Sequence, residues 1–168
     1  MSVAHTSKEQ NKETSISLGV RRRFEFMEFR LFWEERLNRR DLMEFFEISV
    51  PQASMDLTRY QELAPGNIVY DKKAKCYVVT PEFRPLFLKP DSSRYLAQLR
   101  SISVGILAEQ ESWIPNLPSY DVLPLPRRDI DPKRLQAVLR AIRDKKALKI
   151  KYQSLSRPEP MLRWITPH

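Results

Sequence analysis

Five residues in one short segment have side chains that could contact the edges of DNA bases. The segment, ISVPQASMDLTRYQELAPG at residues 48–66, contains Gln52, Ser54, Met55, Thr58 and Arg59. Gln can pair with adenine, Arg with guanine, and Ser or Thr with either base, while an apolar side chain can touch the methyl group of thymine. If these five residues share one face of a helix, that face carries a single charge, on Arg59. Ordinary surface helices more often carry charges paired at i,i+4.

The same segment predicts a short helix that presents these side chains on one side. Ser49 is placed to cap its N-terminus, with Pro51 in the first turn, and Pro65 with Gly66 ends it. An inward face needs an apolar stripe, and one runs along the opposite side: Val50, Ala53, Leu57 and Tyr60.

Two helices are predicted before this segment and a hairpin after it. The first helix lies within residues 20–38, where apolar residues recur at helical spacing, and the second covers residues 39–47 after a cap at Asn38. Residues 68–70 and 76–79 are β-rich runs joined by a short basic connection. This order is typical of a winged helix-turn-helix, whose last helix enters the major groove of DNA.

Basic residues stand where such a domain would meet the DNA backbone. Contacts to phosphates position a protein on the duplex but do not specify its sequence. The candidates lie at the start of the second helix and at the hairpin: Arg39, Arg40, Lys72, Lys73 and Lys75.

A protein-interaction module remains the alternative, because three helices and a hairpin also occur in that class. A lysine-rich hairpin tip is often only solvated, and Phe26, Phe29 and Trp33, which widen the apolar stripe of the first helix, could serve either the core or a partner chain. The combination of element order, capping and outer-face chemistry favours DNA binding.

Charge and composition are compatible with a nucleic-acid partner, but they do not show which part of the chain would bind it. The chain of 168 residues has a net charge of +8 and a pI near 9.7. Residues 1–90 have a net charge of only +2, and residues 91–168 have +6. No apolar run approaches the roughly 20 residues that span a bilayer. The single cysteine, Cys76, permits no internal disulfide, fits a reducing cytoplasm and is expected in the core.

The sequence offers no residues for catalysis, and we expect no enzymatic activity, cofactor or metal. The three glycines are too far apart for a phosphate-binding loop. The two histidines, His5 and His168, are at opposite ends of the chain, and with one cysteine they make no zinc site.

Beyond the hairpin, the chain alternates helices with proline-rich sequence. Asp91 is placed to cap a helix whose apolar positions run from Tyr95 to Ile106, and prolines recur through residues 115–126. Asp131 is placed to cap another helix. Two strands are then expected in ALKIKYQSLS and LRWITPH.

Two stretches resemble one protein family. RRRFEFMEFRLFWEERLNRRDLMEFFEISVPQASMDLTRYQELAPGNIVYDKKAKCYVVTPEF is similar to the N-terminal domain of the WYL-domain transcriptional regulators associated with bacterial phage-defence islands. RAIRDKKALKIKYQSLSRPEPMLRWITPH resembles the start of their WYL domain, an SH3-like β-barrel. The resemblance covers about residues 20–168, although the Trp-Tyr-Leu tripeptide of the family is not present.

The resemblance implies a homodimeric DNA-binding regulator, usually a repressor, that binds an inverted repeat in a double-stranded DNA operator. Its promoter would be its own or a defence-associated one. The WYL domain would sense an effector, such as a nucleotide or nucleic-acid fragment. The matching positions in the part of that domain present here are Tyr152, Ser154, Ser156, Arg163 and His168.

The expected fold is therefore α+β, and four parts are expected along the chain. Residues 1–18 form a disordered lead, 19–90 a winged helix-turn-helix, 91–130 a helical and proline-rich connector, and 131–168 a helix with the first strands of a WYL barrel. With only two strands of that barrel, residues 147–168 are expected to be poorly ordered or held only against the preceding helix. A rival hypothesis is a truncated interaction protein that pairs with a full-length relative and modulates it.

Overall fold

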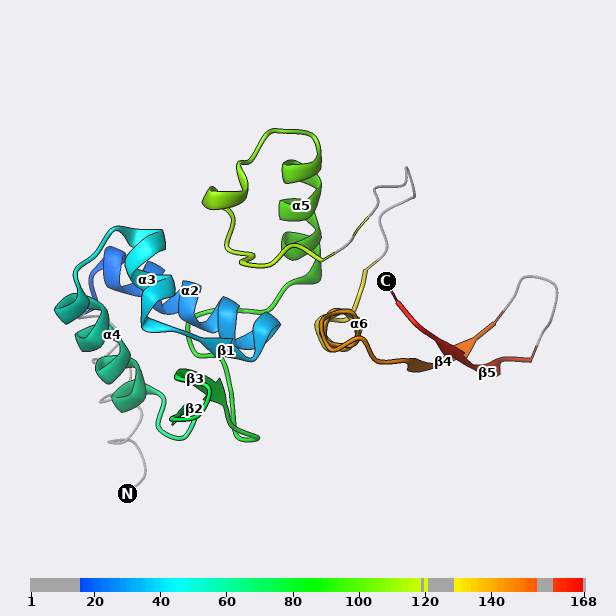
Figure 1. Cartoon of the computed structure of the whole chain (residues 1–168), viewed down its shortest axis with the longest axis horizontal. Helices are drawn as coiled ribbons and strands as arrows, with labels where there is room; N and C mark the ends of the chain where they lie inside the picture. Colours follow the sequence, from blue (N-terminus) through cyan, green and yellow to red (C-terminus); the bar gives the residue numbers. More distant parts are fainter. Residues whose placement is uncertain (1–15, 119, 121–128, 154–158, 168) are drawn as a thin grey trace, which may run out of the picture. The chain divides into compact units, whose positions relative to one another are not determined.

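The computed structural model describes residues 16–118, 120, 129–153 and 159–167 (Figure 1). The chain divides into two compact units, one ending at Lys89 and the other beginning at Pro90. Small antiparallel sheets accompany the helices in both units, which confirms the α+β class. Most of the expected disordered lead, residues 1–15, lies outside the described residues. No described helix is long and apolar enough to cross a bilayer.

The first unit has the predicted order of three helices and a hairpin. The helices are α2 (Leu18–Glu34), α3 (Arg39–Phe46) and α4 (Val50–Leu63), and the hairpin consists of β2 (Ile68–Asp71) and β3 (Cys76–Val79). Capping predicted the two later helix starts correctly. The side chain of Asn38 accepts a hydrogen bond from the backbone of α3, and that of Ser49 accepts one from α4.

A short strand between α2 and α3 was not predicted. Helix α2 ends at Glu34 because Glu35, with φ 61°, adopts the left-handed conformation. The chain then runs extended as β1 (Arg36–Leu37), which pairs antiparallel with β3 and completes a three-stranded sheet in the order β1-β3-β2. Two residues carry too little pattern to predict a strand, since the pairing depends on a partner 40 positions away.

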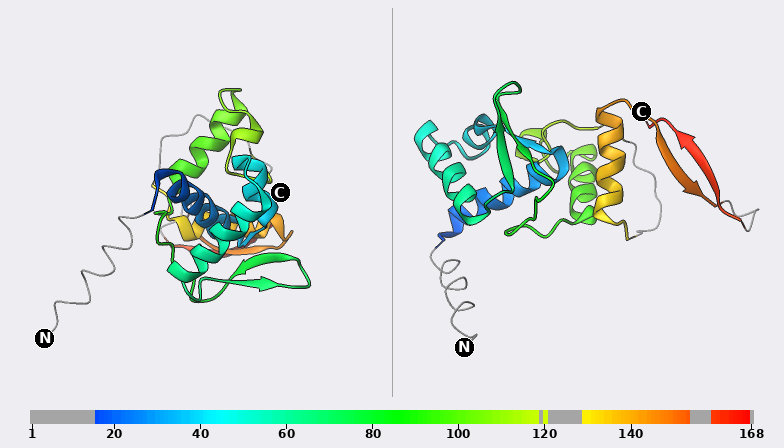
Figure 2. Two further views of the ribbon diagram at one scale, coloured as in Figure 1. Left: turned by 90° about the vertical axis from the view of Figure 1, so that its left-hand side faces the viewer. Right: turned by 90° about the horizontal axis from the view of Figure 1, so that it is seen from below.

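The core of the first unit is built around α2. Four of its five aromatic residues are buried, so the widened stripe noted in the sequence belongs to packed structure: Phe24, Phe26, Phe29 and Trp33 are at most 2% exposed. The Phe26 ring stacks on that of Phe45 from α3 at 4.7 Å between centroids. These contacts hold α3 on α2, and α4 lies at the edge of the unit in contact with both α2 and α3 (Figures 1 and 2).

A buried carboxylate links α2 to α4 and to the segment that follows the hairpin. Glu28 is 0% exposed and accepts hydrogen bonds from the backbone N–H groups of Leu86, Phe87 and Leu88, at 2.6, 2.7 and 2.7 Å. The hydroxyl of Tyr60 in α4 donates a fourth, at 3.2 Å. Burial raises the pKa of Glu28, while these four donors oppose the shift by favouring the charged form.

The partners of Tyr60 extend this network. Burial, reinforced by the Glu28 carboxylate, raises the pKa of Tyr60, so its hydroxyl stays protonated and donates. Asn67 donates from Nδ2 to the Tyr60 hydroxyl at 3.1 Å and to the carbonyl of Arg84 at 2.8 Å. The same Asn67 accepts from the backbone N–H of Arg84 at 3.0 Å. The chain after the hairpin is thus held by the side chains of Glu28 and Asn67, and Tyr60 hydrogen-bonds to both of them.

The second unit contains α5 (Ser92–Ser103), a 3-10 turn η1 (Glu109–Glu111), α6 (Pro132–Arg143) and a hairpin of β4 (Leu148–Tyr152) and β5 (Met161–Ile165). Caps predicted both helix starts correctly, because Asp91 and Asp131 accept from the first turns. The expected continuation of α5 to Ile106 is wrong. The helix ends at Ser103, Gly105 takes a φ of 71°, and Ile106 is 79% exposed.

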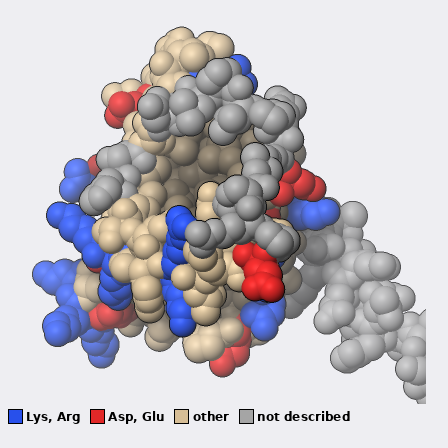
Figure 3. Space-filling view, turned by 90° about the vertical axis from the view of Figure 1, so that its right-hand side faces the viewer, with Lys and Arg blue, Asp and Glu red and all other residues tan. Residues whose placement is uncertain are grey.

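The β4–β5 ladder is regular but buries little. Its register runs from Leu148 opposite Ile165 to Tyr152 opposite Met161. Leu162 and Trp164 are 64% and 69% exposed. On the face that Figure 3 shows, Lys and Arg lie in several places, with Asp and Glu also present among the neutral residues. A two-stranded hairpin is marginal without a packed face, so its expected weak order stays a prediction.

Hydrogen exchange tests the stability of this hairpin. In the 168-residue protein, backbone amides of β4 and β5 should exchange far faster than those of α2, because few of the hairpin's side chains are buried. Mass spectrometry of deuterium uptake measures both segments in one sample. Protection of β4 and β5 equal to that of α2 in monomeric protein would contradict the expectation.

Replacing Glu28 tests the buried network. In Glu28→Gln, an amide NH₂ faces backbone N–H donors, so we expect the free energy of unfolding to fall by about 2 to 4 kcal/mol. Urea-induced unfolding followed by circular dichroism measures the loss. The matched control is Glu25→Gln on the same helix, whose carboxylate pairs at 3.5 Å with the exposed Arg21 and should contribute less than about 0.5 kcal/mol. Equal losses in the two variants would argue against the network.

Candidate nucleic-acid interface

Helix α4 is anchored at its start and along one side. The Ser49 hydroxyl accepts from the backbone N–H of Gln52 at 3.3 Å, and Pro51 lies in the first turn. Ala53, Leu57 and Tyr60 are at most 1% exposed, so they form the inward face as predicted. Val50, expected on that face, is 44% exposed because it lies at the helix end.

The remaining residues of α4 divide into an outward strip and two flanks. Successive residues turn by roughly 100° around a helix, which places Met55 and Thr58 opposite the buried stripe. Met55 is 65% exposed and Thr58 is also exposed. Gln52 and Arg59 lie on one flank and Ser54 on the other, and all three are half-buried. The five predicted base-contacting residues therefore do not share one surface.

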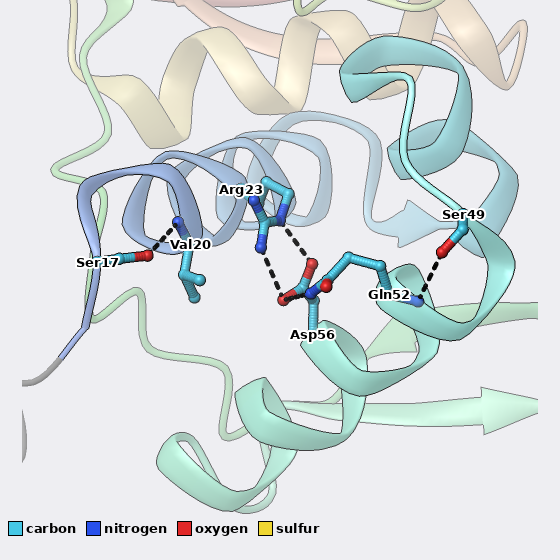
Figure 4. Close-up of polar contacts among 6 residues, drawn as sticks. All are labelled: Ser17, Val20, Arg23, Ser49, Gln52 and Asp56. Atoms are coloured by element: carbon cyan, nitrogen blue, oxygen red, sulfur yellow. Dashed lines mark hydrogen bonds and ion pairs between the residues drawn. The ribbon is translucent and has the colours of Figure 1, made fainter.

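The flank of Gln52 carries a bonded cluster that the sequence did not reveal (Figure 4). Gln52 donates from Nε2 to Oδ1 of Asp56 at 3.1 Å. Arg23 of α2 donates two hydrogen bonds to the same carboxylate, from Nε at 2.6 Å and from Nη2 at 3.1 Å. The Asp56 side chain is only 3% exposed. Helical spacing indicates the Gln52–Asp56 contact, but nothing local indicates that Arg23 completes it.

On the opposite flank, one predicted base contact and one predicted phosphate contact lie together. Arg39 donates from Nη1 to the Ser54 hydroxyl oxygen at 3.1 Å, and that hydroxyl donates to the carbonyl of Val50 at 2.9 Å. The Ser54 proton is therefore engaged within α4. Arg39 itself is exposed at the start of α3, so its other donors can reach a ligand.

An open groove of about 300 Å³ lies between α4, the start of α3 and the β2–β3 hairpin. Sequence reasoning missed its aromatic residues, Tyr70 and Tyr77, which face each other across the hairpin with ring centroids 5.1 Å apart. Cys76 also lines the groove and is half-buried, so the expectation that it lies in the core is wrong. The full lining is Asn38, Arg39, Ser54, Leu57, Thr58, Tyr70, Lys75, Cys76 and Tyr77.

The hairpin tip is a structured turn that exposes its lysines. Oδ1 of Asp71 accepts from the backbone N–H groups of Lys73 and Ala74, at 2.8 and 3.0 Å. Lys75 has a φ of 55°, and its carbonyl accepts from Asn38 Nδ2 at 3.4 Å. Lys72, Lys73 and Lys75 are all exposed, at positions fixed by this turn.

Arg40, the remaining predicted phosphate contact, has an acidic neighbour. Its Nε lies 2.5 Å from Oε1 of Glu44, and hydrogen bonding to that carboxylate raises the pKa of Arg40. Both side chains are exposed, and such i,i+4 pairs are weak. Arg40 can therefore exchange this partner for a phosphate at little cost.

Two of the five residues expected to bind an effector lie together. The guanidinium carbon of Arg163 in β5 lies 4.7 Å from the ring centroid of Tyr152 in β4. Ser154, Ser156 and His168 lie outside the described residues. Within the described residues, no group of three or more His, Cys, Asp or Glu side chains could hold a metal ion.

Comparison with known proteins finds a family model that matches the first unit and most of α5. Residues 19–101 match the family model of the BrxR transcriptional regulator winged helix-turn-helix domain. The chain is 42% identical over 160 residues to the DNA-binding transcriptional repressor CapW of Stenotrophomonas maltophilia. It is 37% identical over 150 residues to proteins of the same name from Escherichia coli (strain KTE188) and Pseudomonas aeruginosa.

These alignments cover most of this chain but only half of each relative. They include 95% of this chain and 54% of the Stenotrophomonas protein, and 89% and 50% for the other two. The chain thus spans about half the length of the relatives it matches.

Proposed function

We propose that residues 19–101, which match the family model of the BrxR winged helix-turn-helix domain, bind DNA and that the chain is a sequence-specific DNA-binding transcriptional repressor. One observation carries the proposal: the exposed strip of α4 adjoins a groove whose other walls carry cations from α3 and the hairpin. Such a domain binds DNA and is not catalytic. The relatives named as repressors support the same function.

In the proposed complex, α4 lies in the major groove of double-stranded DNA. Met55 and Thr58 point toward the bases, with Gln52, Ser54 and Arg59 at the two sides of the contact. Lys72, Lys73 and Lys75 of the hairpin and Arg39 and Arg40 of α3 meet the flanking phosphates. Tyr70 and Tyr77 join this interface as donors from the groove.

The rest of the regulatory cycle follows from the family resemblance. We propose that two copies pair as a homodimer on an inverted repeat, at the protein's own promoter or a defence-associated one in the cytoplasm. A nucleotide or nucleic-acid effector would bind the WYL part of the protein. The Arg163–Tyr152 pair supports this proposal, because it offers a cation and an aromatic face to such a ligand.

The first test concerns base contacts. Arg59→Ala should weaken binding to the preferred duplex by about 1 to 3 kcal/mol and relax the preference at one position. Purified protein is titrated against DNA from upstream of its own gene, with random-sequence competitor present. Arg134→Ala, which removes an exposed arginine from α6, is the matched control and should leave the preference unchanged. Equal weakening on preferred and random duplexes would make Arg59 a phosphate contact instead.

The second test concerns the hairpin. If Lys72, Lys73 and Lys75 meet phosphates, each Lys→Gln variant should weaken binding to all duplexes alike. The plot of log affinity against log salt concentration should become shallower by about 0.9 for each phosphate interaction that a variant removes. Lys133→Gln on α6 is the charge-matched control. Unchanged slopes for all three hairpin variants would show that the hairpin points away from DNA.

A further inference from the structure

The amide of Gln52 has only one orientation compatible with its neighbour. An ionised carboxylate accepts hydrogen bonds and donates none. Because Gln52 contacts Oδ1 of Asp56, its NH₂ group must face Asp56, and its carbonyl oxygen Oε1 must face away. Of the two hydrogens on Nε2, one is engaged with Asp56, and the other is left, together with Oε1, for a ligand.

Asp56 can impose this orientation because it is itself immobilised. Its carboxylate accepts two hydrogen bonds from the planar guanidinium of Arg23, and its side chain is almost fully buried. Two parallel hydrogen bonds fix the angle as well as the position of a carboxylate. The orientation of Gln52 on α4 is thus set by a residue on α2 (Figure 4).

We propose that Arg23 and Asp56 are positioning residues that make Gln52 selective for adenine over guanine. This inference rests on the proposed function. In the major groove adenine presents an acceptor, N7, and a donor, the N6 amino group, whereas guanine presents two acceptors, N7 and O6. The held amide offers one donor and one acceptor, which match adenine. Against guanine, Oε1 would face O6, and two acceptors repel.

A free glutamine lacks this selectivity. Its amide can turn over and donate both hydrogens of Nε2 to the two acceptors of guanine. The Asp56 carboxylate prevents this because the turned amide would place Oε1 against a carboxylate oxygen. Asp56 therefore excludes guanine at this position without touching DNA. Arg23 contributes indirectly, because its two hydrogen bonds hold the Asp56 carboxylate in place.

The experiment begins with a pool of random duplexes from which the wild-type protein selects its preferred sequence. Affinities are then measured for duplexes that differ only by adenine or guanine at each selected position. Asp56→Asn keeps the shape but adds an NH₂ group that can bond the turned Oε1. We expect it to lower the adenine preference at one position by roughly fivefold to a hundredfold, while affinity for random duplexes stays unchanged. Gln52→Ala should remove the preference at the same position.

The double variant separates positioning from a merely structural role. If Asp56 acts through Gln52, then Asp56→Asn added to Gln52→Ala should change the adenine-to-guanine ratio no further. A ratio that survives Asp56→Asn in folded protein, or a uniform loss on all duplexes, overturns the inference. Wild-type protein that selects no sequence overturns the proposed function, and the adenine preference with it.

A measurement on the wild-type protein tests whether the Gln52 amide is held in place, and it does so even if Asp56→Asn does not fold. Nuclear magnetic resonance relaxation of side-chain amides should give Gln52 an order parameter close to that of Asn67, which is buried and hydrogen-bonded. Gln61, exposed on the same helix, is the mobile reference. A Gln52 amide as mobile as that of Gln61 overturns the inference.

Discussion

The buried carboxylate of Glu28 is the constraint on which the first unit depends. A charge in the core is costly unless every lone pair has a donor, and here four donors from two other segments converge on it. Through Tyr60 it fixes α4, and through Leu86 to Leu88 it fixes the chain that leaves the hairpin. The helix proposed to contact DNA and the exit toward the second unit are therefore positioned from one point on α2.

Helix α4 combines packing and recognition because its faces have different partners. Its inner face is apolar and fully buried, its outward strip is free, and each flank is held by an arginine from another helix. Arg23 reaches one flank through Asp56, and Arg39 reaches the other through Ser54. Polar side chains in the expected recognition surface are thus pre-ordered, which lowers the entropy lost when a ligand binds.

The two units differ in how fully their apolar side chains are buried. The first unit has a buried core, in which four donors satisfy the Glu28 carboxylate. The second contains a hairpin with exposed apolar side chains such as Trp164. Lys149 lies 5.9 Å from the Trp164 ring centroid and covers it only in part. A two-stranded hairpin of this kind is marginally stable unless further strands or a helix pack against it.

The sequence by itself determined the starts of the later helices and the hairpin, and with them the winged-helix order. Caps at Asn38, Ser49 and Asp131 act on the adjacent turn, so they can be recognised locally. The outward position of Met55 and Thr58 on α4 was predictable from helical spacing, whereas the five predicted base-contacting residues proved not to share one surface. Strand β1, the donors around Glu28 and the hydrogen bonds from Arg23 to Asp56 were decided only by tertiary structure. Each joins residues more than thirty positions apart or depends on such a contact, and no local pattern encodes which distant group will arrive.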